Sequence, residues 1–182
     1  MAKNYQTNQF DDYPVVNISR EGALLYCKWL TEKLNKQRGD NVIARLPTAE
    51  EWMYAAMGGV ENAAMPWGGA YLCNTKGHYL LNFAVDSSLR EKCMAARNPS
   101  KQNIDVVKSK ALGDIAPEER ETFTSPVHSY WANPYGLYNM CGNAAEMTAT
   151  AGSTKGGSWE TSGKYVWIQS KFDAYEGVTD PS

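Results

Sequence analysis

One irregular stretch, Asn133–Met147 (NPYGLYNMCGNAAEM), constrains the fold of this chain more than any other. An Asn-Pro start and two internal glycines, Gly136 and Gly142, interrupt any regular helix or strand. Four apolar side chains within it can anchor such a loop: Tyr135, Leu137, Tyr138 and Met140. The sequence therefore predicts a tightly turned loop that is held against the protein core.

Two residues of this loop, Asn143 and Glu146, carry oxygen donors three positions apart. Side-chain oxygens combined with free backbone carbonyls suit Ca²⁺ better than a transition metal. The same pair could instead begin a short helix, with Asn143 as its N-cap and Glu146 in its first turn. These residues alone leave both interpretations open.

The length of 182 residues predicts a single domain, 1–182, with a sizeable core. Eighteen basic and 20 acidic residues are nearly balanced, which argues against a nucleic-acid partner. No apolar run reaches the length of a membrane span. The polar start is not typical of a signal peptide, which fits either a cytosolic protein or a fragment without its leader.

Four cysteines lack the CxxC spacing of a zinc site: Cys27, Cys73, Cys93 and Cys141. Only two histidines, His78 and His128, could complete such a site, so zinc is not expected. Cys73 and Cys93 could form a disulfide or remain free. The other two cysteines are predicted to be small buried apolar residues.

Helices are predicted at three places. The first spans Arg20–Asn35 and has one apolar face, made of Ala23, Leu24, Cys27, Leu30 and Leu34. The second begins at a capping box, Thr48 to Glu51, and ends at Gly58-Gly59. A third is the best candidate within a long charged excursion, Val85–Glu121, at Asp86–Ala96.

Extended segments are predicted at Tyr13–Ile18 and Val42–Leu46, and strands at Lys155–Trp159 and Tyr165–Ile168. Three tryptophans are predicted to lie in the core: Trp52, Trp67 and Trp159. Arg45 is predicted to form a structural ion pair or to bond carbonyls near Glu50 or Glu51.

Five motifs in a fixed order resemble the formylglycine-generating-enzyme (sulfatase-modifying-factor) superfamily: YPVVNIS, RLPTAEEWMYAA, PWGG, NPYGLYNMCGNAAEM and KGGSW. The resemblance implies an α+β, C-type-lectin-like fold, with two helices around small twisted antiparallel sheets and much irregular structure. The family's usual strands before Tyr13 and after Ser182 are not visible. Their absence suits a fragment or one piece of a larger assembly.

The resemblance also implies calcium. In family members the Gly-Asn-x-x-Glu segment binds Ca²⁺, which here points to the side chains of Asn143 and Glu146 with carbonyls such as those of Gly142 and Ala144. A second family site uses an Asn-apolar pair that resembles Asn82-Phe83. Its carboxylate partner has no clear match in this sequence.

The resemblance does not extend to the copper site. The family's enzymes bind Cu(I) through two cysteines, and thiolates are the ligands that Cu(I) requires. Thr161 and Val166 occupy those positions, and no cysteine follows Cys141. This departure from the family pattern predicts a protein that binds no copper and is not a formylglycine-generating enzyme.

The segments WGGAYLCNTKGHYLLNF and SPVHSYWANPYGLYNMCGNAAEM resemble domains of Bacteroidota envelope lipoproteins of gliding motility and type IX secretion. This implies a structural module with protein partners in a periplasmic or outer-membrane-associated assembly. One alternative is an enzyme of altered chemistry, with candidate groups Thr161, Tyr165, Glu160 and His128. Another is a ligand-display domain whose variable surface is Glu160–Lys171.

Overall fold

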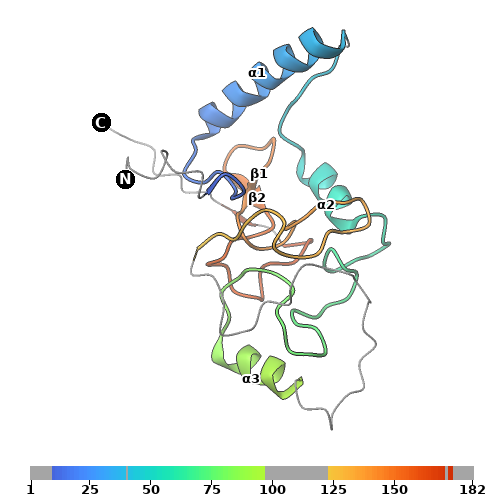
Figure 1. Cartoon of the computed structure of the whole chain (residues 1–182), viewed down its shortest axis with the longest axis vertical. Helices are drawn as coiled ribbons and strands as arrows, with labels where there is room; N and C mark the ends of the chain where they lie inside the picture. The colour runs from blue at the N-terminus through green and yellow to red at the C-terminus, as the bar shows by residue number, and fades with distance from the viewer. Residues whose placement is uncertain (1–9, 40, 97–122, 171, 174–182) are drawn as a thin grey trace, which may run out of the picture.

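The computed structural model describes residues 10–39, 41–96, 123–170 and 172–173. Helices and short strands occupy a minor part of this length, and turns and irregular segments make up the rest: α1 (Arg20–Arg38), α2 (Ala49–Met57), α3 (Ser87–Ala96), β1 (Glu146–Met147), β2 (Ser153–Lys155) and β3 (Phe172–Asp173). Figure 1 shows α1 at one end of the molecule, α3 at the other and an irregular body between them. The predicted α+β class, rich in irregular structure, is confirmed.

The strands form one small antiparallel sheet in the order β1-β2-β3. Glu146 lies opposite Lys155 in the register of β1 and β2. The predicted strand Lys155–Trp159 begins earlier and ends sooner than expected. It stops at Lys155 because Gly156 and Gly157 take left-handed φ angles of 85° and 71°.

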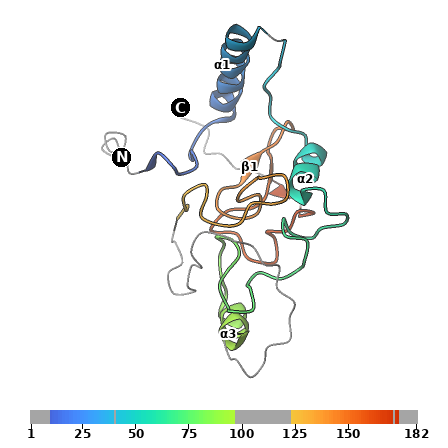
Figure 2. The ribbon, with the colours of Figure 1, turned by 45° about the vertical axis from the view of Figure 1, so that its right-hand side comes forward.

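Helix α1 begins and ends at strong local signals. The Ser19 side chain accepts from the N–H of Gly22, and Gly39 closes the helix with φ 70°. The predicted apolar face is only partly covered: Ala23 is buried, Cys27, Leu30 and Leu34 are half-buried, and Leu24 remains 46% exposed. Figures 1 and 2 show the reason, since α1 stands away from the body.

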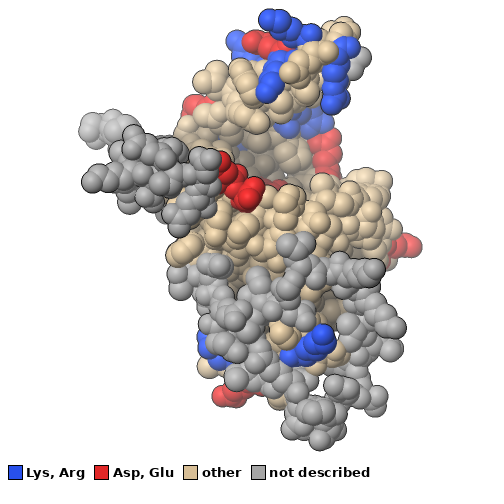
Figure 3. All heavy atoms as spheres, in the orientation of Figure 1, with Lys and Arg blue, Asp and Glu red and all other residues tan. Residues whose placement is uncertain are grey.

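The N-terminal end of α1 is tied to the turn between β1 and β2. The Arg20 guanidinium donates to the carbonyls of Thr148 (2.9 Å), Ala149 and Thr150 (3.4 Å). Figure 3 shows that basic side chains gather on the projecting helix, whereas the middle of this face is mostly uncharged. No helix among the described residues is long and apolar enough to cross a membrane.

Helix α2 confirms its predicted boundaries. The Thr48 hydroxyl accepts from the N–H of Glu51, the Glu51 carboxylate accepts from the N–H of Thr48, and Gly58 ends the helix with φ 60°. Trp52 and Ala56 face the core as expected. The predicted ion pair of Arg45 with Glu51 is also present, with a shortest N–O distance of 2.6 Å.

The predicted helix within the excursion is confirmed as α3, whose first turn is capped by Asp86 through its bond from the N–H of Leu89. The part of the excursion at 97–122 lies outside the described residues. Segments Tyr13–Ile18 and Val42–Leu46 belong to no strand of the described sheet. The predicted strand Tyr165–Ile168 is wrong, because that segment lies in turns closed at Ser162 and Ser170.

The hydrophobic core lies between α2, the 79–83 segment and the 140–168 region. Trp52 is central to it, and Trp67 packs against its edge. The prediction is wrong for Trp159, which is only half-buried and belongs to no part of this cluster. Cys141 is buried as predicted, whereas Cys27 is only partly buried because α1 projects from the body.

Candidate functional site

The central loop is fixed to the end of α2 by one buried side chain, Asn133. Its Nδ2 donates to the carbonyls of Ala55 and Ala56, at 2.7 and 3.2 Å. Its Oδ1 accepts from the N–H groups of Tyr135 and Leu137, both at 3.0 Å. This confirms an anchored, irregular loop, but the prediction of its anchors is wrong for Tyr135 and Leu137, which are 48% and 38% exposed.

Asn143, in the same loop, is buried and takes the left-handed conformation, with φ 67°. Its Nδ2 donates to the carbonyl of Ser125 at 3.1 Å, and its Oδ1 accepts from the N–H of Ser125 at 2.7 Å. The Asn82 amide approaches the same oxygen at 3.4 Å. The helix-cap interpretation is wrong, because the chain enters strand β1 after Asn143 rather than a helix.

Three segments meet at Gly142. A Cβ at this position would lie 2.3 Å from the carbonyl oxygen of Asn82, and the N–H of Gly142 donates to Gly156 at 2.9 Å. The N–H of Asn143 donates to the same Asn82 oxygen at 2.8 Å. The absence of a side chain at Gly142 thus allows the central loop to contact both the 79–83 segment and the KGGSW motif.

The Glu146 carboxylate accepts a 2.6 Å hydrogen bond from the indole N–H of Trp52. The residue keeps exposed surface overall, but protein atoms surround its carboxyl end closely. This burial raises the pKa of Glu146, and the bond from Trp52 opposes the increase. On the neighbouring strand, Lys155 is buried, donates to the carbonyl of Ser170 at 2.6 Å and lies 5.6 Å from the Trp52 ring centroid.

The nearby Cys141 thiol is a poor nucleophile. Burial is the main cause that raises its pKa, the Glu146 carboxylate adds to the increase and Lys155 opposes it. Because the reactive form of a cysteine is the thiolate, this group stays protonated and unreactive at neutral pH.

The first predicted calcium site fits Ca²⁺ poorly. Of its expected side chains, Asn143 accepts two N–H donors at Oδ1 and Glu146 bonds to Trp52. Asn143 Oδ1 and one of the two carboxylate oxygens of Glu146, Oε2, are therefore used by the protein itself. Gly142 and Ala144 contribute only backbone carbonyls to such a site.

The second predicted site, at Asn82-Phe83, fits better. Asn82 is 1% exposed, and its Oδ1 is buried without a hydrogen-bond partner. Its Nδ2 donates to the carbonyl of Phe123 at 2.8 Å. Because the two ends of an amide have the same shape, a half-turn would aim Oδ1 beside the Phe123 carbonyl. A cation would satisfy both of these oxygens.

Thr161 and Val166 are engaged in the packing and bonding of the protein itself. The Thr161 hydroxyl accepts from the N–H of Ser158 at 2.8 Å, and the Thr161 carbonyl accepts from the N–H of Ala84 at 2.9 Å. Val166 is 0% exposed and belongs to the main hydrophobic cluster. The side chain at the second cysteine position thus packs inside the core.

The other candidate catalytic groups are not joined into one network. Glu160 is exposed and Tyr165 is more than half exposed. His128 packs edge-on against Tyr138, with ring centroids 4.7 Å apart. Among the described residues, no hydrogen bond links His128 to either of them.

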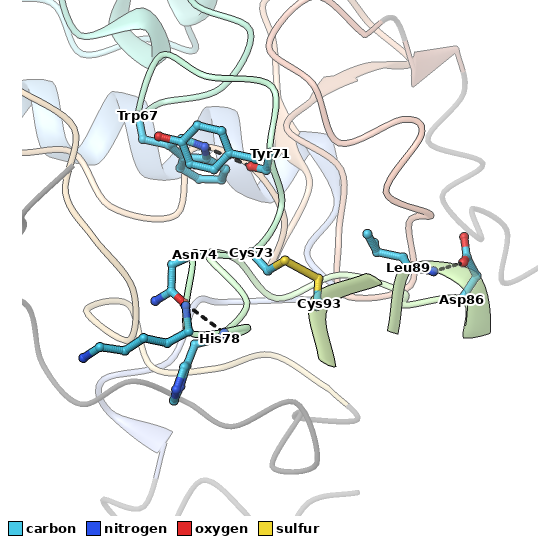
Figure 4. Close-up of a disulfide and its surroundings, with 9 residues drawn as sticks. Trp67, Tyr71, Cys73, Asn74, His78, Asp86, Leu89 and Cys93 are labelled. Carbon is cyan, nitrogen blue, oxygen red and sulfur yellow. Dashed lines mark hydrogen bonds between the residues drawn. A yellow bond between two sulfur atoms is a disulfide. The ribbon is translucent and has the colours of Figure 1, made fainter. Parts of the chain in front are cut away.

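Cys73 and Cys93 form a disulfide, which resolves the alternative left open by the sequence. Figure 4 shows that it joins the loop around Asn74 and His78 to α3. Asn74 Oδ1 accepts from the N–H of His78 at 3.0 Å, which keeps this loop closed beside the disulfide. Cys93 itself is fully buried, so the link fastens α3 to the core.

Three partners in this region were missed in the sequence. Ser125 binds Asn143 through its backbone, Trp52 binds Glu146 across 94 positions, and Lys155 is buried rather than at a surface. The Ser-Pro dipeptide at Ser125 and the lysine within an otherwise small-residue motif were the available signals. Neither signal indicates a partner so distant in sequence.

Comparisons with known proteins concern the family and the fold of the chain. Residues 2–172 match the FGE-sulfatase family model, described as the sulfatase-modifying factor enzyme 1-like domain. The formylglycine-generating enzyme of Bos taurus is 29% identical over 138 residues, which cover 76% of this chain and 27% of that protein. The inactive C-alpha-formylglycine-generating enzyme 2 of Bos taurus is 31% identical over 140 residues, covering 76% of this chain and 33% of its own.

The chain spans about a quarter to a third of the length of these curated relatives. Among solved structures, variable protein 1 of Treponema denticola superposes with a TM-score of 0.54 at 19% identity, over 92% of this chain and 67% of that one. This likeness concerns the fold alone. The family match over most of the chain means that it belongs to the sulfatase-modifying factor enzyme 1-like (FGE-sulfatase) family.

Proposed function

We propose that this chain is a non-catalytic member of its family and serves as a structural or protein-binding module. The observation that supports this most directly is the state of Thr161 and Val166. Neither side chain can supply the thiolate that Cu(I) chemistry requires, and Val166 is wholly buried in the core. The match to inactive C-alpha-formylglycine-generating enzyme 2 shows that relatives described as inactive exist.

A direct assay tests this proposal. The purified chain is incubated with Cu(I), oxygen and a peptide that carries the cysteine substrate motif of the formylglycine-generating enzymes. We expect no aldehyde in the peptide and no tight Cu(I) binding, whereas an active formylglycine-generating enzyme in parallel produces aldehyde. Aldehyde formation by this chain would contradict the proposal.

We place the module in the cell envelope, in an assembly of the gliding-motility or type IX secretion kind. The Cys73–Cys93 disulfide supports an oxidising compartment, since such bonds are rare in the cytosol. Alkylation of acid-quenched cells should leave both cysteines unmodified until a reductant is added. Recovery of the two free thiols would argue against an envelope location.

Affinity purification from envelope fractions should recover stoichiometric protein partners, and recovery of a bare monomer would argue against the binding role.

We further propose that Ca²⁺, when bound, is held at Asn82 and Phe83 rather than at Asn143 and Glu146. A bound cation would compensate the buried Asn82 oxygen that lacks a hydrogen-bond donor. The thermal melting temperature should then rise with added Ca²⁺ and fall with a chelator, because a ligand of the folded state stabilises it. The carboxylate of Asn82→Asp should strengthen this dependence, whereas Glu146→Gln, which removes the only carboxylate of the first predicted site, should leave it unchanged. An unchanged melt in both conditions would remove calcium from the proposal.

Ligand display is a second candidate function, supported by the pattern of the Glu160–Lys171 segment. Its described part alternates exposed residues, such as Lys164 and Tyr165, with buried Val166 and Ile168. Lys171 lies outside the described residues. Replacing the exposed positions together should leave the melting temperature nearly unchanged if they form a tolerant surface. A large loss of stability would count against display.

A further inference from the structure

Two tyrosines from distant parts of the chain form an exposed pair beside the central loop. Tyr54 comes from α2 and is 64% exposed, and Tyr135 comes from the loop and is 48% exposed. Their hydroxyl oxygens lie 3.1 Å apart, and their ring centroids are 5.9 Å apart with the planes tilted by 45°. None of the functions proposed above uses this pair.

The pair is held by rigid surroundings. Asn133 bonds the last carbonyls of α2 and the N–H of Tyr135, so helix and loop are fastened at the base of the two rings. Gly58 lies so close to Pro134 that a Cβ would approach the proline Cδ to 2.7 Å. These contacts limit the separation of the two rings while the protein is folded.

The rings lie alongside each other rather than end to end. Two phenols joined end to end through a hydroxyl bond of this length would have centroids much farther apart than 5.9 Å. The two distances therefore place the hydroxyl-bearing ends of the rings, where the ortho carbons lie, closer together than the ring centres. The hydroxyl of Tyr135 donates to the Tyr54 oxygen, and this bond is the main cause that raises the pKa of Tyr135 and favours its protonated form.

We propose that Tyr54 and Tyr135 form an oxidative cross-linking site. A haem peroxidase, with hydrogen peroxide as the oxidant, joins the two side chains there as 3,3′-dityrosine. The peroxidase removes one hydrogen atom, as a proton and an electron, from each phenol. The two radicals couple through a new carbon–carbon bond between ortho carbons. The hydrogens on those carbons then move to the oxygens and restore both aromatic rings. In total two hydrogens leave the protein, and one hydrogen peroxide is reduced to two water molecules.

The test treats the dilute purified chain with a haem peroxidase and hydrogen peroxide. Dityrosine is measured by its blue fluorescence in the monomer fraction, and its position by mass spectrometry of the digested protein. We expect a monomer that is lighter by two hydrogens and a cross-linked peptide pair containing Tyr54 and Tyr135. The cross-linked form should also melt at a higher temperature, because the new bond joins residues 81 positions apart.

Variants that keep the rings separate the outcomes. Tyr54→Phe and Tyr135→Phe should each lose at least about ten-fold of the monomer fluorescence, whereas Tyr165→Phe, at an equally exposed tyrosine, should retain it. If a variant folds poorly, the cross-linked peptides identified in the wild-type protein still decide whether Tyr54 and Tyr135 are joined. Intrachain fluorescence that persists in Tyr54→Phe, or cross-links found only between molecules, would overturn the proposal.

Discussion

At the scale of single residues, Gly142 is the most tightly constrained position of the central loop. Its φ of 75° disfavours any side chain, and its Cβ position lies 2.3 Å from the Asn82 carbonyl oxygen. Gly136 offers a matched comparison, since its φ is 79° but nothing lies within 4 Å of its Cβ position. The two glycines therefore separate the cost of backbone strain from that of a steric clash.

We predict that Gly142→Ala lowers the free energy of unfolding by roughly 3–5 kcal/mol, because strain and clash add. Gly136→Ala should cost only about 1–2 kcal/mol, the strain of the left-handed conformation. Urea unfolding of both variants measures the difference. Equal losses would mean that the close contact with Asn82 contributes nothing to stability.

Local residue chemistry could be predicted from the sequence, but its distant partners could not. The capping box at Thr48 and Glu51 lies within one turn, so spacing alone identifies it. Asn143 was singled out from the sequence, but its hydrogen-bond partner Ser125 lies 18 positions away. The bond of Glu146 with Trp52 spans 94 positions. No periodic pattern records such a contact, so the sequence alone cannot identify it.

At the scale of elements, the start of α2 combines its cap with an ion pair. The hydrogen bond from Arg45 is the main cause that lowers the pKa of Glu51 to about 2 from the usual 4.5, and the bond from the N–H of Thr48 adds to it. The unfolded chain thus binds a proton at Glu51 at a higher pH than the folded chain does. The stability that this carboxylate contributes is fully present above about pH 4.5 and is lost as pH falls toward about 2.

We predict that Arg45→Ala raises the pKa of Glu51 toward its usual value and flattens the fall of stability across this acidic window. The change is small because both side chains are exposed to solvent. NMR titration of the Glu51 carboxyl and urea unfolding at several acidic pH values measure it. Arg38→Ala, at an exposed arginine in the last turn of α1, is the control and should leave the titration unchanged.

Helices were easier to predict than strands, and the reason lies in where their contacts come from. Caps and glycine stops identified α1 and α2 locally. The predicted strand Tyr165–Ile168 has the right apolar residues, but Val166 and Ile168 are buried from within turns. Burial without a pairing partner leaves the same sequence pattern as a strand. The partial exposure of the apolar face of α1 was not predicted, because periodicity identifies such a face but does not show whether another element covers it.

At the scale of the whole molecule, five weak motifs in order predicted the family and its α+β fold, because order and spacing carry more information than any one motif. The arrangement of the ends could not be predicted in this way. α1 projects at one end, and α3 at the other is joined to the body by the Cys73–Cys93 disulfide. Because the described strands are short, the hydrophobic core around Trp52, the side-chain hydrogen bonds and this link hold the irregular body together.

The disulfide should therefore control α3 more than the rest of the molecule. We predict that Cys73→Ser with Cys93→Ser lowers the free energy of unfolding by about 3 kcal/mol, as expected for a link across 20 positions. In this variant, amide hydrogen exchange should accelerate more in α3 than in α2, because the cap and the Trp52 packing of α2 remain. Cys27→Ser, at a free cysteine of α1, is the matched control and should affect neither helix strongly. Equal acceleration in α2 and α3 would mean that the link stabilises the whole molecule and not α3 in particular.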